Sequence, residues 1–243
     1  MAPVAGQSPT HAQVAPEGPV QAGLTLVVPV LNAAASLTAT LTAMAGTPGL
    51  VETIVVDGGS TDDTAALAIA AGARVLTAPR GRGPQLRAGV AAATTPWVLV
   101  LHADTVLTGE WRTAIAQHTT GPGDRAGYFA FALDDPTPAA RRIERLVAWR
   151  CRRLALPYGD QGLLIHRGLY DAVGGYRAIP LMEDVDLIRR VGRRRLVRLD
   201  AVALTSAIRY RRGGYLRRPL RNLVCLSLYF LGVPPRWIAR LYA

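Results

Sequence analysis

The chain has 243 residues, half of them hydrophobic, and its formal net charge is +11 at pH 7. This length and apolar content favour one folded domain with a sizeable core over two domains. No apolar stretch reaches the roughly 20 residues that a membrane-spanning helix needs, which excludes a chain that crosses a bilayer.

The first 22 residues differ in composition from the rest of the chain. They consist mostly of Ala, Pro, Gly, Gln and Val, with almost no charge and no periodicity. They lack both the basic start and the continuous apolar run of a secretory signal peptide. We therefore predict a disordered tail over residues 1–22 and a single domain over residues 23–243.

Short apolar runs alternate with helix-like segments up to residue 104. Strands are predicted where a run is short, rich in residues that favour β-strands and bounded by turn residues: Leu24–Val30, Val51–Val56, Ala73–Ala78 and Trp97–Leu101. Helices are predicted at Ser36–Met44 with Ser36 as the cap, at about Asp62–Ala71 with acidic residues in the first turn, and at Pro84–Ala93. This alternation predicts an α/β fold with a mostly parallel sheet between two layers of helices.

The second half of the chain is less regular and more basic. Its predicted elements are helices at Ala139–Leu154, Met182–Val191, Pro219–Leu231 and Pro235–Tyr242, and strands at Gln161–Ile165 and Val202–Ala207. All 28 basic residues are arginines, concentrated after residue 140, which indicates an anionic partner: nucleic acid, a diphosphate-bearing substrate or an anionic membrane. Cys151 and Cys225 are predicted to be buried free thiols.

Three of the predicted strands end in polar or turn residues. Pro29 lies near the end of the first strand, Asp57 follows the second and Asp104 follows the fourth. Because ligands of such sheets bind beyond the carboxyl ends of the strands, these residues predict a site at that edge. Gly58 and Gly59 allow a tight turn beside Asp57, whose carboxylate can accept hydrogen bonds from a base or ribose. An ordinary strand-to-helix turn uses the same residue types.

His102 and Asp104 lie two residues apart after the fourth strand. If the extended backbone continues, both side chains point to the same side. A hard cation prefers oxygen ligands, so Asp104 can bind Mg²⁺ or Mn²⁺, and the imidazole of His102 suits Mn²⁺ better. A capping aspartate beside a histidine at the strand end is the alternative.

Three carboxylates crowd into four residues at Glu183, Asp184 and Asp186. Adjacent acids raise one another's pKa, which helps one of them act as a general base. The acidic first turn of a helix accounts for the same pattern.

Two further segments place polar side chains next to glycines. Asp160 and Gln161 can hydrogen-bond several hydroxyl groups of a sugar. Arg209, Arg211 and Arg212 are expected in a basic loop that closes over a diphosphate, because guanidinium groups match phosphate oxygens. A solvated or membrane-facing basic surface is the alternative.

Together these segments resemble the family 2 glycosyltransferases of GT-A fold, from Leu24 to about Tyr242. The segments that carry the resemblance are Val27–Asn32, Val55–Asp62, His102–Asp104, Gly174–Tyr176 and Glu183–Asp184. Four others resemble a small bacterial subgroup associated with arsenosugar biosynthesis or selenodomains: Pro79–Gly83, His102–Thr105, Gly159–Gln161 and Pro180–Asp184. The family resemblance implies a three-layer, Rossmann-like sandwich with C-terminal helices.

The resemblance implies a metal-dependent, inverting hexosyltransferase that moves a sugar from a nucleoside diphosphate sugar, expected to be a UDP-hexose, to an acceptor hydroxyl. Asp57 would hold the base, and Asp104, with His102, would bind Mn²⁺ or Mg²⁺. Asp184, with Glu183 beside it, would deprotonate the acceptor. The other residues expected to bind the nucleotide-sugar are Pro29, Asn32, Gly58, Arg82, His102, Ala103, Asp160, Gln161, Arg209, Arg211 and Arg212.

Three positions depart from the family pattern. Ala33 stands where a glutamate is usual and Arg87 where an asparagine is common, which affects the expected base preference. His102 stands where many members have the first aspartate of the metal motif, which affects the identity and affinity of the metal.

Other classes of protein fit the sequence less well. A dinucleotide-binding protein or a GT-A nucleotidyltransferase needs a Gly-rich loop after the first strand, where the chain has Leu31-Asn32-Ala33. A basic nucleic-acid-binding protein agrees with the charge, yet aromatic residues do not interleave the arginine runs.

The predicted partners are therefore the nucleotide-sugar donor and a small-molecule, lipid or glycan acceptor, with no nucleic acid. A cytoplasmic location is expected. Arginines over residues 141–153 and 217–221, with the apolar run Leu223–Val233, favour peripheral association with the anionic inner face of the plasma membrane.

Overall fold

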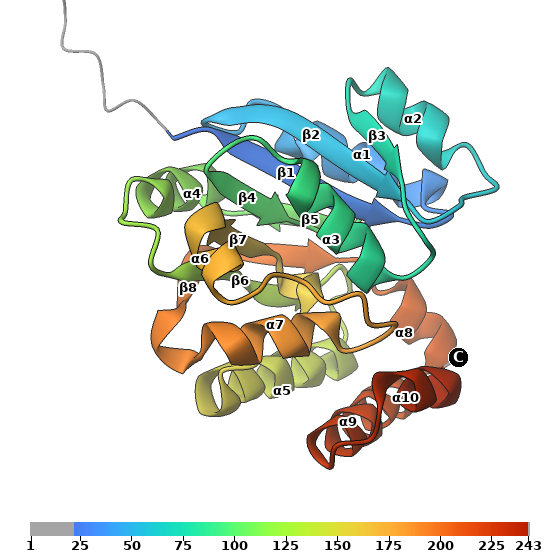
Figure 1. Cartoon of the computed structure of the whole chain (residues 1–243). Coiled ribbons are helices and arrows are strands. Elements are labelled where there is room, and N and C mark those ends of the chain that lie inside the picture. Colours follow the sequence, from blue (N-terminus) through green and yellow to red (C-terminus); the bar gives the residue numbers. More distant parts are fainter. Residues whose placement is uncertain (1–21, 243) are drawn as a thin grey trace, which may run out of the picture.

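The computed structural model describes residues 22–242, and they form an α/β fold around one eight-stranded sheet (Figure 1). The strands are β1 (Leu24–Val30), β2 (Leu50–Asp57), β3 (Arg74–Thr77), β4 (Trp97–Val100), β5 (Thr105–Thr108), β6 (Ala126–Leu133), β7 (Leu163–His166) and β8 (Leu196–Thr205). The predicted tail over residues 1–22 lies outside the described residues, apart from Ala22.

Helices connect and follow these strands. They are α1 (Ala34–Met44), α2 (Thr64–Ala70), α3 (Arg82–Ala92), α4 (Trp111–Thr119), α5 (Pro138–Leu154), α6 (Arg167–Ala172), α7 (Glu183–Val191), α8 (Ile208–Gly213), α9 (Arg217–Phe230) and α10 (Pro235–Tyr242). Short 3-10 turns cover Gly159–Gln161 and Arg193–Arg195.

The strand order is β3-β2-β1-β4-β7-β6-β8-β5. The strands β3, β2, β1 and β4 pair in parallel, and β6 pairs in parallel with β8. The strand β7 runs antiparallel to both of its neighbours, and β5 runs antiparallel to β8. The predicted mostly parallel sheet is confirmed, with antiparallel pairing confined to the second half of the sheet.

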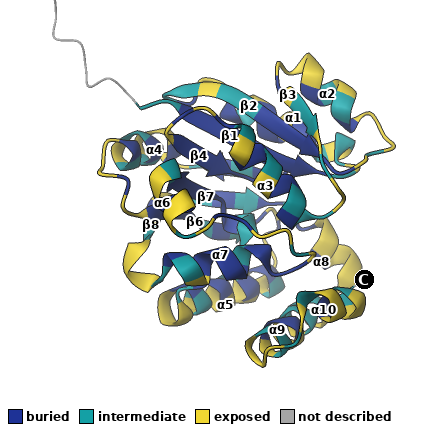
Figure 2. Ribbon diagram, in the orientation of Figure 1, coloured by how far each residue is buried: buried dark blue, intermediate teal, exposed yellow. Residues whose placement is uncertain are grey.

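The sheet separates two layers of helices, which is why every residue of β1 is buried. Alternate residues of a strand face opposite sides of a sheet. Leu24, Leu26, Val28 and Val30 pack with α1, α2 and α4, whereas Val27 packs with α3, α6 and α7 on the other face. Figure 2 shows the central strands buried beneath these layers.

Helix α3 lies unusually close to the sheet because of Gly89. A Cβ atom at Gly89 would lie 2.5 Å from a side-chain carbon of Val27 and 2.8 Å from one of Val56. The absence of a side chain therefore allows close packing of α3 on β1 and β2. This packing brings Arg82 and Gln85, in the first turn of α3, over the ends of both strands.

Besides the apolar layers on the two faces of the sheet, a further apolar cluster joins the C-terminal part of the chain to the sheet. Tyr128 and Phe131 of β6 pack against Ile143 and Val147 of α5 and against Tyr210 of α8. Helices α9 and α10 follow at one corner of the molecule and carry wide exposed faces (Figures 1 and 2). Of the helices in residues 22–242, none has the length and apolar character to cross a membrane.

Most predicted elements are confirmed, with two corrections at helix starts. Ser36 is not the cap of α1, because the helix begins at Ala34 and Ser36 lies in its first turn. The acids before α2 are not in its first turn, because that helix begins at Thr64. The carboxylate of Asp62 instead accepts hydrogen bonds from the backbone N–H groups of Thr64 and Ala34. Cys151 and Cys225 are buried free thiols, as predicted.

The second half of the chain needs larger corrections. Strand β7 begins two residues later than predicted, after the 3-10 turn, and β8 is longer and begins at Leu196. The segment expected as a basic loop is helix α8. Four elements were not predicted, namely β5, α4, β6 and α6. Half of the eight residues of β6 are Ala or Gly, which have weak strand propensity, and its strand formers are Tyr128, Phe129 and Phe131.

Candidate active site

The ends of β1 and β2 are held side by side at one edge of the sheet. Val30 pairs with Asp57 in the parallel register. The side-chain amide of Gln85 donates hydrogen bonds to the carbonyl groups of Val30 and Val56, both at 2.7 Å. A Cβ atom on Gly58 would lie 3.1 Å from this amide. Gln85, which sequence reasoning did not find, therefore ties α3 to both strand ends.

The turn after β2 is held by hydrogen bonds to polar side chains of the turn itself and of Asn32, which follows β1. The Asp57 carboxylate accepts hydrogen bonds from the N–H of Ser60 at 3.0 and 3.1 Å and from its hydroxyl at 2.6 Å. The Asn32 side-chain oxygen accepts one from the N–H of Thr61 at 2.8 Å, and Asn32 adopts a positive φ of 50°. These contacts leave a preformed wall beside the strand ends.

A cavity of about 270 Å³, here called the donor cavity, opens against this wall. Its lining includes seven residues predicted from the sequence: Pro29, Asn32, Arg82, His102, Ala103, Asp104 and Arg209. Gln85 and Ala33 line it as well, whereas the predicted residues Asp57 and Gly58 are not part of its lining. Arg87, the departure from the family pattern on α3, is exposed elsewhere.

The segment His102-Ala103-Asp104 is a turn, so the prediction that His102 and Asp104 share one side of an extended backbone is wrong. The N–H of Thr105 donates back to the carbonyl of His102, and the chain then enters β5. The Ala103 carbonyl accepts a hydrogen bond from the Thr40 hydroxyl of α1 at 2.9 Å. The turn nevertheless directs both His102 and Asp104 to the cavity lining.

His102 is neutral at physiological pH. Burial lowers its pKa to about 3, and the charges of Arg82 and Arg209 act in the same direction. Gly159 lies against its ring, since a Cβ atom there would lie 2.7 Å from Nε2 of His102 and 3.6 Å from Oδ2 of Asp184. A glycine is therefore required for the 3-10 turn to approach both side chains.

The start of α7 places its first two carboxylates in different surroundings. Asp184 lines a second cavity, and its Oδ2 accepts a hydrogen bond from the N–H of Gly159 at 2.9 Å. Glu183 is 1% exposed and forms an ion pair with Arg82, whose Nε lies 2.9 Å from Oε1 of Glu183. Burial raises the pKa of Glu183, and the charge of Asp184 adds to this, whereas Arg82 opposes it. Only Asp184 is open to a substrate.

The side chains of Asp160 and Gln161 also lie in different surroundings. Asp160 lines the second cavity, and within the described residues its buried Oδ1 has no hydrogen-bond partner. Burial raises its pKa to about 6, with Arg150 opposing the shift. The side chain of Gln161 points into the protein, where it donates to the Phe129 carbonyl and accepts from the N–H of Tyr158. Gln161 therefore holds the turn and does not line either cavity.

The three arginines near residue 210 point to different surroundings because they lie on helix α8. Arg209 lines both cavities, and its guanidinium group lies 3.7 Å from the Asp104 carboxylate. Arg211 instead lies 3.5 Å from Asp134, and Arg212 is exposed. Tyr210 is buried in the cluster with β6 and α5, and this fixes which face of α8 meets the site.

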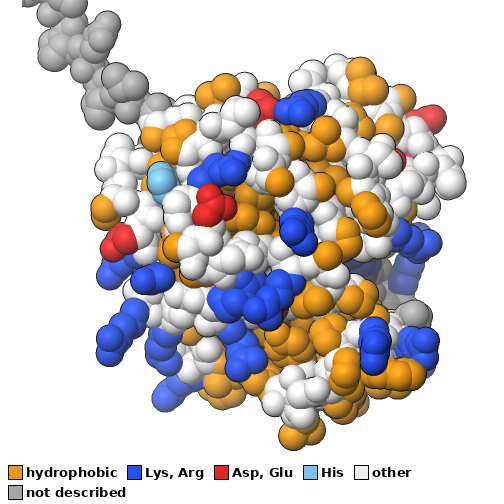
Figure 3. Space-filling view, in the orientation of Figure 1, with side chains coloured by type: hydrophobic (Ala, Val, Ile, Leu, Met, Phe, Trp, Pro, Cys, Tyr) orange, Lys and Arg blue, Asp and Glu red, His pale blue; other side chains and the backbone are white. Residues whose placement is uncertain are grey.

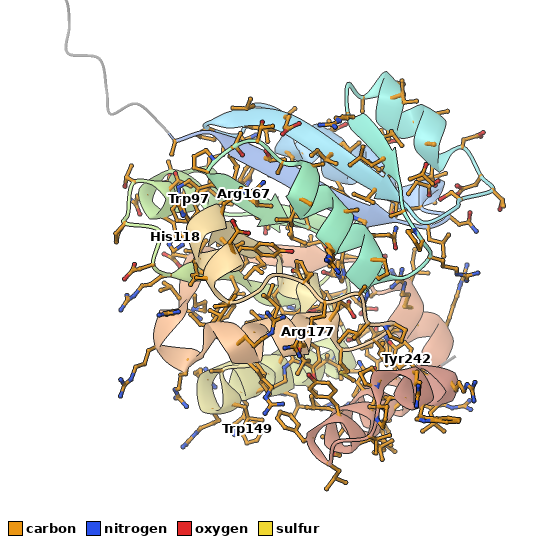
Figure 4. The ribbon with its side chains drawn as sticks, in the orientation of Figure 1. Trp97, His118, Trp149, Arg167, Arg177 and Tyr242 are labelled. Carbon is orange, nitrogen blue, oxygen red and sulfur yellow. The ribbon has the colours of Figure 1, made fainter. Side chains whose placement is uncertain are left out.

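The second cavity, here called the catalytic cavity, has a volume of about 90 Å³ and adjoins the donor cavity. Arg82, His102, Asp104 and Arg209 line both. Ten of its lining residues were not predicted as site residues, among them Tyr158, Tyr210, Arg218, Asn222 and Tyr242. Figure 4 shows Tyr242, the last residue of α10, near the C-terminal end of the described chain. No local pattern marks Arg218 or Asn222, because only the packing of α9 brings them here.

The described residues contain no group of three or more His, Cys, Asp or Glu side chains arranged to hold a metal ion by themselves. A divalent cation on a nucleoside diphosphate does not need such a group. Mg²⁺ is often held by one or two carboxylates together with substrate phosphates and water. The Asp104 carboxylate and the neutral imidazole of His102 at the shared lining therefore fit a cation that a substrate brings.

Comparison with known sequences places the chain beside sugar-transferring proteins. The family model described as Glycosyl transferase family 2 matches residues 25–179. An uncharacterized glycosyltransferase of Mycobacterium tuberculosis is 36% identical over 165 residues, which cover 63% of this chain and 74% of that relative. A protein of the same description from Mycobacterium bovis gives the same values.

Comparison with solved structures establishes the fold. Glucosyl-3-phosphoglycerate synthase from Mycobacterium tuberculosis, crystallised with Mn²⁺, UDP and glucosyl-3-phosphoglycerate, aligns with a TM-score of 0.59 at 20% identity, over 88% of this chain and 81% of that chain. A further mycobacterial protein aligns with a TM-score of 0.53 at 22% identity, and the match spans 76% of this chain and 65% of that one.

Proposed function

The chain belongs to glycosyltransferase family 2 and has the GT-A fold, and from this premise we propose that it transfers a hexose from UDP-hexose to an acceptor hydroxyl, with inversion at the anomeric carbon. The narrower bacterial subgroup stays a prediction.

One observation carries the proposal. The donor cavity and the catalytic cavity meet at Arg82, His102, Asp104 and Arg209, which line both. A diphosphate lying across this junction would meet two guanidinium groups and a carboxylate that can share a cation with it. The nucleoside would then lie toward Pro29 and Asn32, and the sugar toward Asp184.

Asp184 is the proposed general base. It lines the catalytic cavity, and the N–H groups of Gly159 and Val185 hold its carboxylate at 2.9 and 2.7 Å. Asp184 takes the proton of the acceptor hydroxyl while the acceptor oxygen bonds to the anomeric carbon. The bond from that carbon to the β-phosphate oxygen breaks, and the nucleoside diphosphate leaves with the electron pair. Arg82 and Arg209 stabilise the charge on the leaving group.

Glu183 has a supporting role in this proposal. Its ion pair engages the Nε of Arg82, and Arg82 lines both cavities. Removing Glu183 would leave Arg82 free to turn away from the diphosphate. Glu183 is therefore a positioning residue.

The proposed cofactor is Mn²⁺ or Mg²⁺, held by Asp104 with the assistance of His102. When bound, the cation would neutralise charge on the diphosphate and make it a better leaving group. The imidazole of His102 is neutral, so its free nitrogen lone pair is compatible with a metal ligand. The synthase of similar fold was crystallised with Mn²⁺ and UDP, which supports both the proposed metal ion and uracil as the base of the donor nucleotide.

The proposal is tested by a thermal-shift panel of UDP-, GDP- and dTDP-sugars with and without Mn²⁺, followed by an assay for nucleotide release. We expect UDP-sugars to raise the melting temperature most, in a manner that EDTA reverses. Binding to DNA without binding or turnover of any nucleotide-sugar would disprove the proposed function.

We further propose peripheral attachment to an anionic membrane surface. It is supported by the exposed apolar side chains of α9 and α10, which lie beside arginines (Figure 3). Each arginine near anionic lipid adds roughly 1 kcal/mol of attraction. Co-sedimentation with phosphatidylglycerol vesicles at low salt tests it, and recovery of the protein in the supernatant would contradict it.

A further inference from the structure

An apolar groove lies between α5 and α9, outside the two cavities described above. It has a volume of about 390 Å³, and its apolar lining includes Leu146, Trp149, Leu154, Leu220, Leu223 and Leu226. Trp149, Leu220 and Leu223 are 52%, 62% and 57% exposed, although each is large and apolar. Figure 4 shows Trp149 on α5 at the edge of the molecule. Apolar surface gathered in a groove marks a binding site more often than scattered exposed residues do.

The groove adjoins the catalytic cavity. Tyr158, Tyr210 and Asn222 line both spaces, so these three residues form the boundary between them. Tyr158 comes directly before the turn that holds Asp160. In that turn the N–H of Gly159 donates a hydrogen bond to Asp184. A molecule that entered the catalytic cavity from the groove would therefore present its polar end to Asp184 and keep its apolar end against α5 and α9.

An unused basic group lines the catalytic cavity on the helix that also forms the groove. Arg218 of α9 lines the catalytic cavity beside Asn222, and its guanidinium carbon lies 5.3 Å from the Tyr210 ring centre. Its Nε is buried and, within the described residues, has no hydrogen-bond partner; the same holds for Nε of Arg221, one position before Asn222. A buried charged donor without an acceptor is unfavourable, so an anionic group of a ligand would satisfy it.

From this arrangement, and resting on the proposed function, we propose that the acceptor is a lipid. Its apolar chain lies in the groove between α5 and α9, its anionic head group binds Arg218, and a hydroxyl of that head group reaches Asp184. The transfer step is unchanged: the hydroxyl proton goes to Asp184, the hydroxyl oxygen bonds to the anomeric carbon, and the nucleoside diphosphate leaves. A water-soluble acceptor would occupy the catalytic cavity alone and leave the groove unused.

Binding is tested with lysophosphatidylglycerols of increasing acyl-chain length, used as monomers, because their head group carries a phosphate and hydroxyls. Burial of each methylene is expected to raise affinity by up to about fourfold until the groove is filled. Trp149 reports occupancy through its fluorescence, and the change should disappear in Trp149→Phe. Glycerol 1-phosphate, the same head group without a chain, should bind far more weakly.

Two variants test the groove itself. Leu220→Gln and Leu223→Gln change exposed side chains, so both should fold, and each is expected to weaken lysophosphatidylglycerol about tenfold while UDP binding stays unchanged. The matched control is Leu241→Gln, which changes a side chain 64% exposed on α10 that does not line the groove. Arg218→Gln should remove the preference for lysophosphatidylglycerol over lysophosphatidylcholine.

The outcomes separate this inference from the proposed function. The lipid proposal is overturned if affinity for lysophosphatidylglycerol does not depend on acyl-chain length, or if Leu241→Gln weakens its binding as much as the groove variants do. Transfer to glycerol 1-phosphate with the same kcat/KM as to the lipid would overturn it as well. A dimer that buries Trp149 and excludes the lipid would assign the groove to a second copy of the chain. Lipid binding without any binding of UDP-sugars would instead overturn the proposed function.

Discussion

The two sides of the site differ in how completely the protein satisfies its own polar groups. On the donor side, the carboxylate of Asp57 and the amides of Asn32 and Gln85 are bound by neighbouring backbone and hydroxyl groups. On the acceptor side, Asp160 Oδ1, Glu183 Oε2 and Arg218 Nε are buried without partners among the described residues. The donor wall is thus rigid in advance, whereas the acceptor side is completed by what binds there.

This difference has an energetic consequence. Preformed hydrogen bonds need no reorganisation when a ligand arrives, so they favour tight and selective binding. Buried polar atoms without partners cost stability, each on the order of 1–3 kcal/mol. Substitutions on the donor side should therefore weaken binding and folding together, whereas substitutions on the acceptor side should reduce catalysis and leave folding unchanged or improved.

Asp184→Asn is expected to have the largest effect. The amide keeps the shape but cannot accept the acceptor proton, so kcat should fall by about 10²–10⁴-fold. Isothermal titration should show unchanged UDP affinity, because Asp184 does not line the donor cavity. The control is Asp171→Asn, at an exposed aspartate on α6, which should retain full activity. Retained transfer in Asp184→Asn would remove it as the base.

Gly159→Ala breaks the packing that joins the two sides. Its Cβ atom would meet Nε2 of His102 at 2.7 Å and displace the turn that holds Asp184. A displacement of about 1 Å in a catalytic group can reduce the rate about 100-fold, so kcat should fall by up to that factor. The matched control is Gly213→Ala on α8, where a Cβ atom meets no other atom within 4 Å. Equal activity of both variants would show that the close approach is unimportant.

Asp57→Ala tests the donor side. Loss of the carboxylate leaves the N–H and hydroxyl of Ser60 without their acceptor and loosens the wall beside the donor cavity. We expect UDP affinity to fall about tenfold and the free energy of unfolding to fall by about 1–3 kcal/mol, measured by urea denaturation. The control Asp63→Ala changes an exposed carboxylate in the same loop. Loss of activity with unchanged stability would contradict the structural role of Asp57.

Asp160→Asn should produce the smallest effect, a change in how stability depends on pH. The folded protein holds a proton on Asp160 up to about pH 6, whereas the unfolded chain releases it near 3.8. Folding therefore takes up a proton between these values, and the free energy of unfolding falls as pH rises from about 4 to about 6.

The asparagine variant should lose this part of the pH dependence and, above pH 6 in EDTA, be more stable than the wild type by about 1–3 kcal/mol. Thermal unfolding from pH 4 to pH 8 measures it, with Asp171→Asn again as the control. Parallel curves for wild type and Asp160→Asn would show that Asp160 ionises normally.

The sequence alone predicted much of the donor side. The apolar run of β1 and the turn residues after β2 and β4 are local patterns, and in a parallel sheet the ends of such strands must meet at one edge. Pro29 and Asp104 were therefore predictable, as was the mostly parallel order of the first four strands, whereas Asn32 was expected from the family resemblance and Gln85 was not predicted.

Only the tertiary structure decided the acceptor side. The sequence shows Glu183 and Asp184 as equivalent neighbours, yet packing of α3 against α7 pairs one with Arg82 and leaves the other in the cavity. Likewise the three arginines near residue 210 separate because α8 is a helix whose Tyr210 is buried. Contacts between distant segments leave no periodic or motif signal, so the groove between α5 and α9 emerges only when the chain is folded.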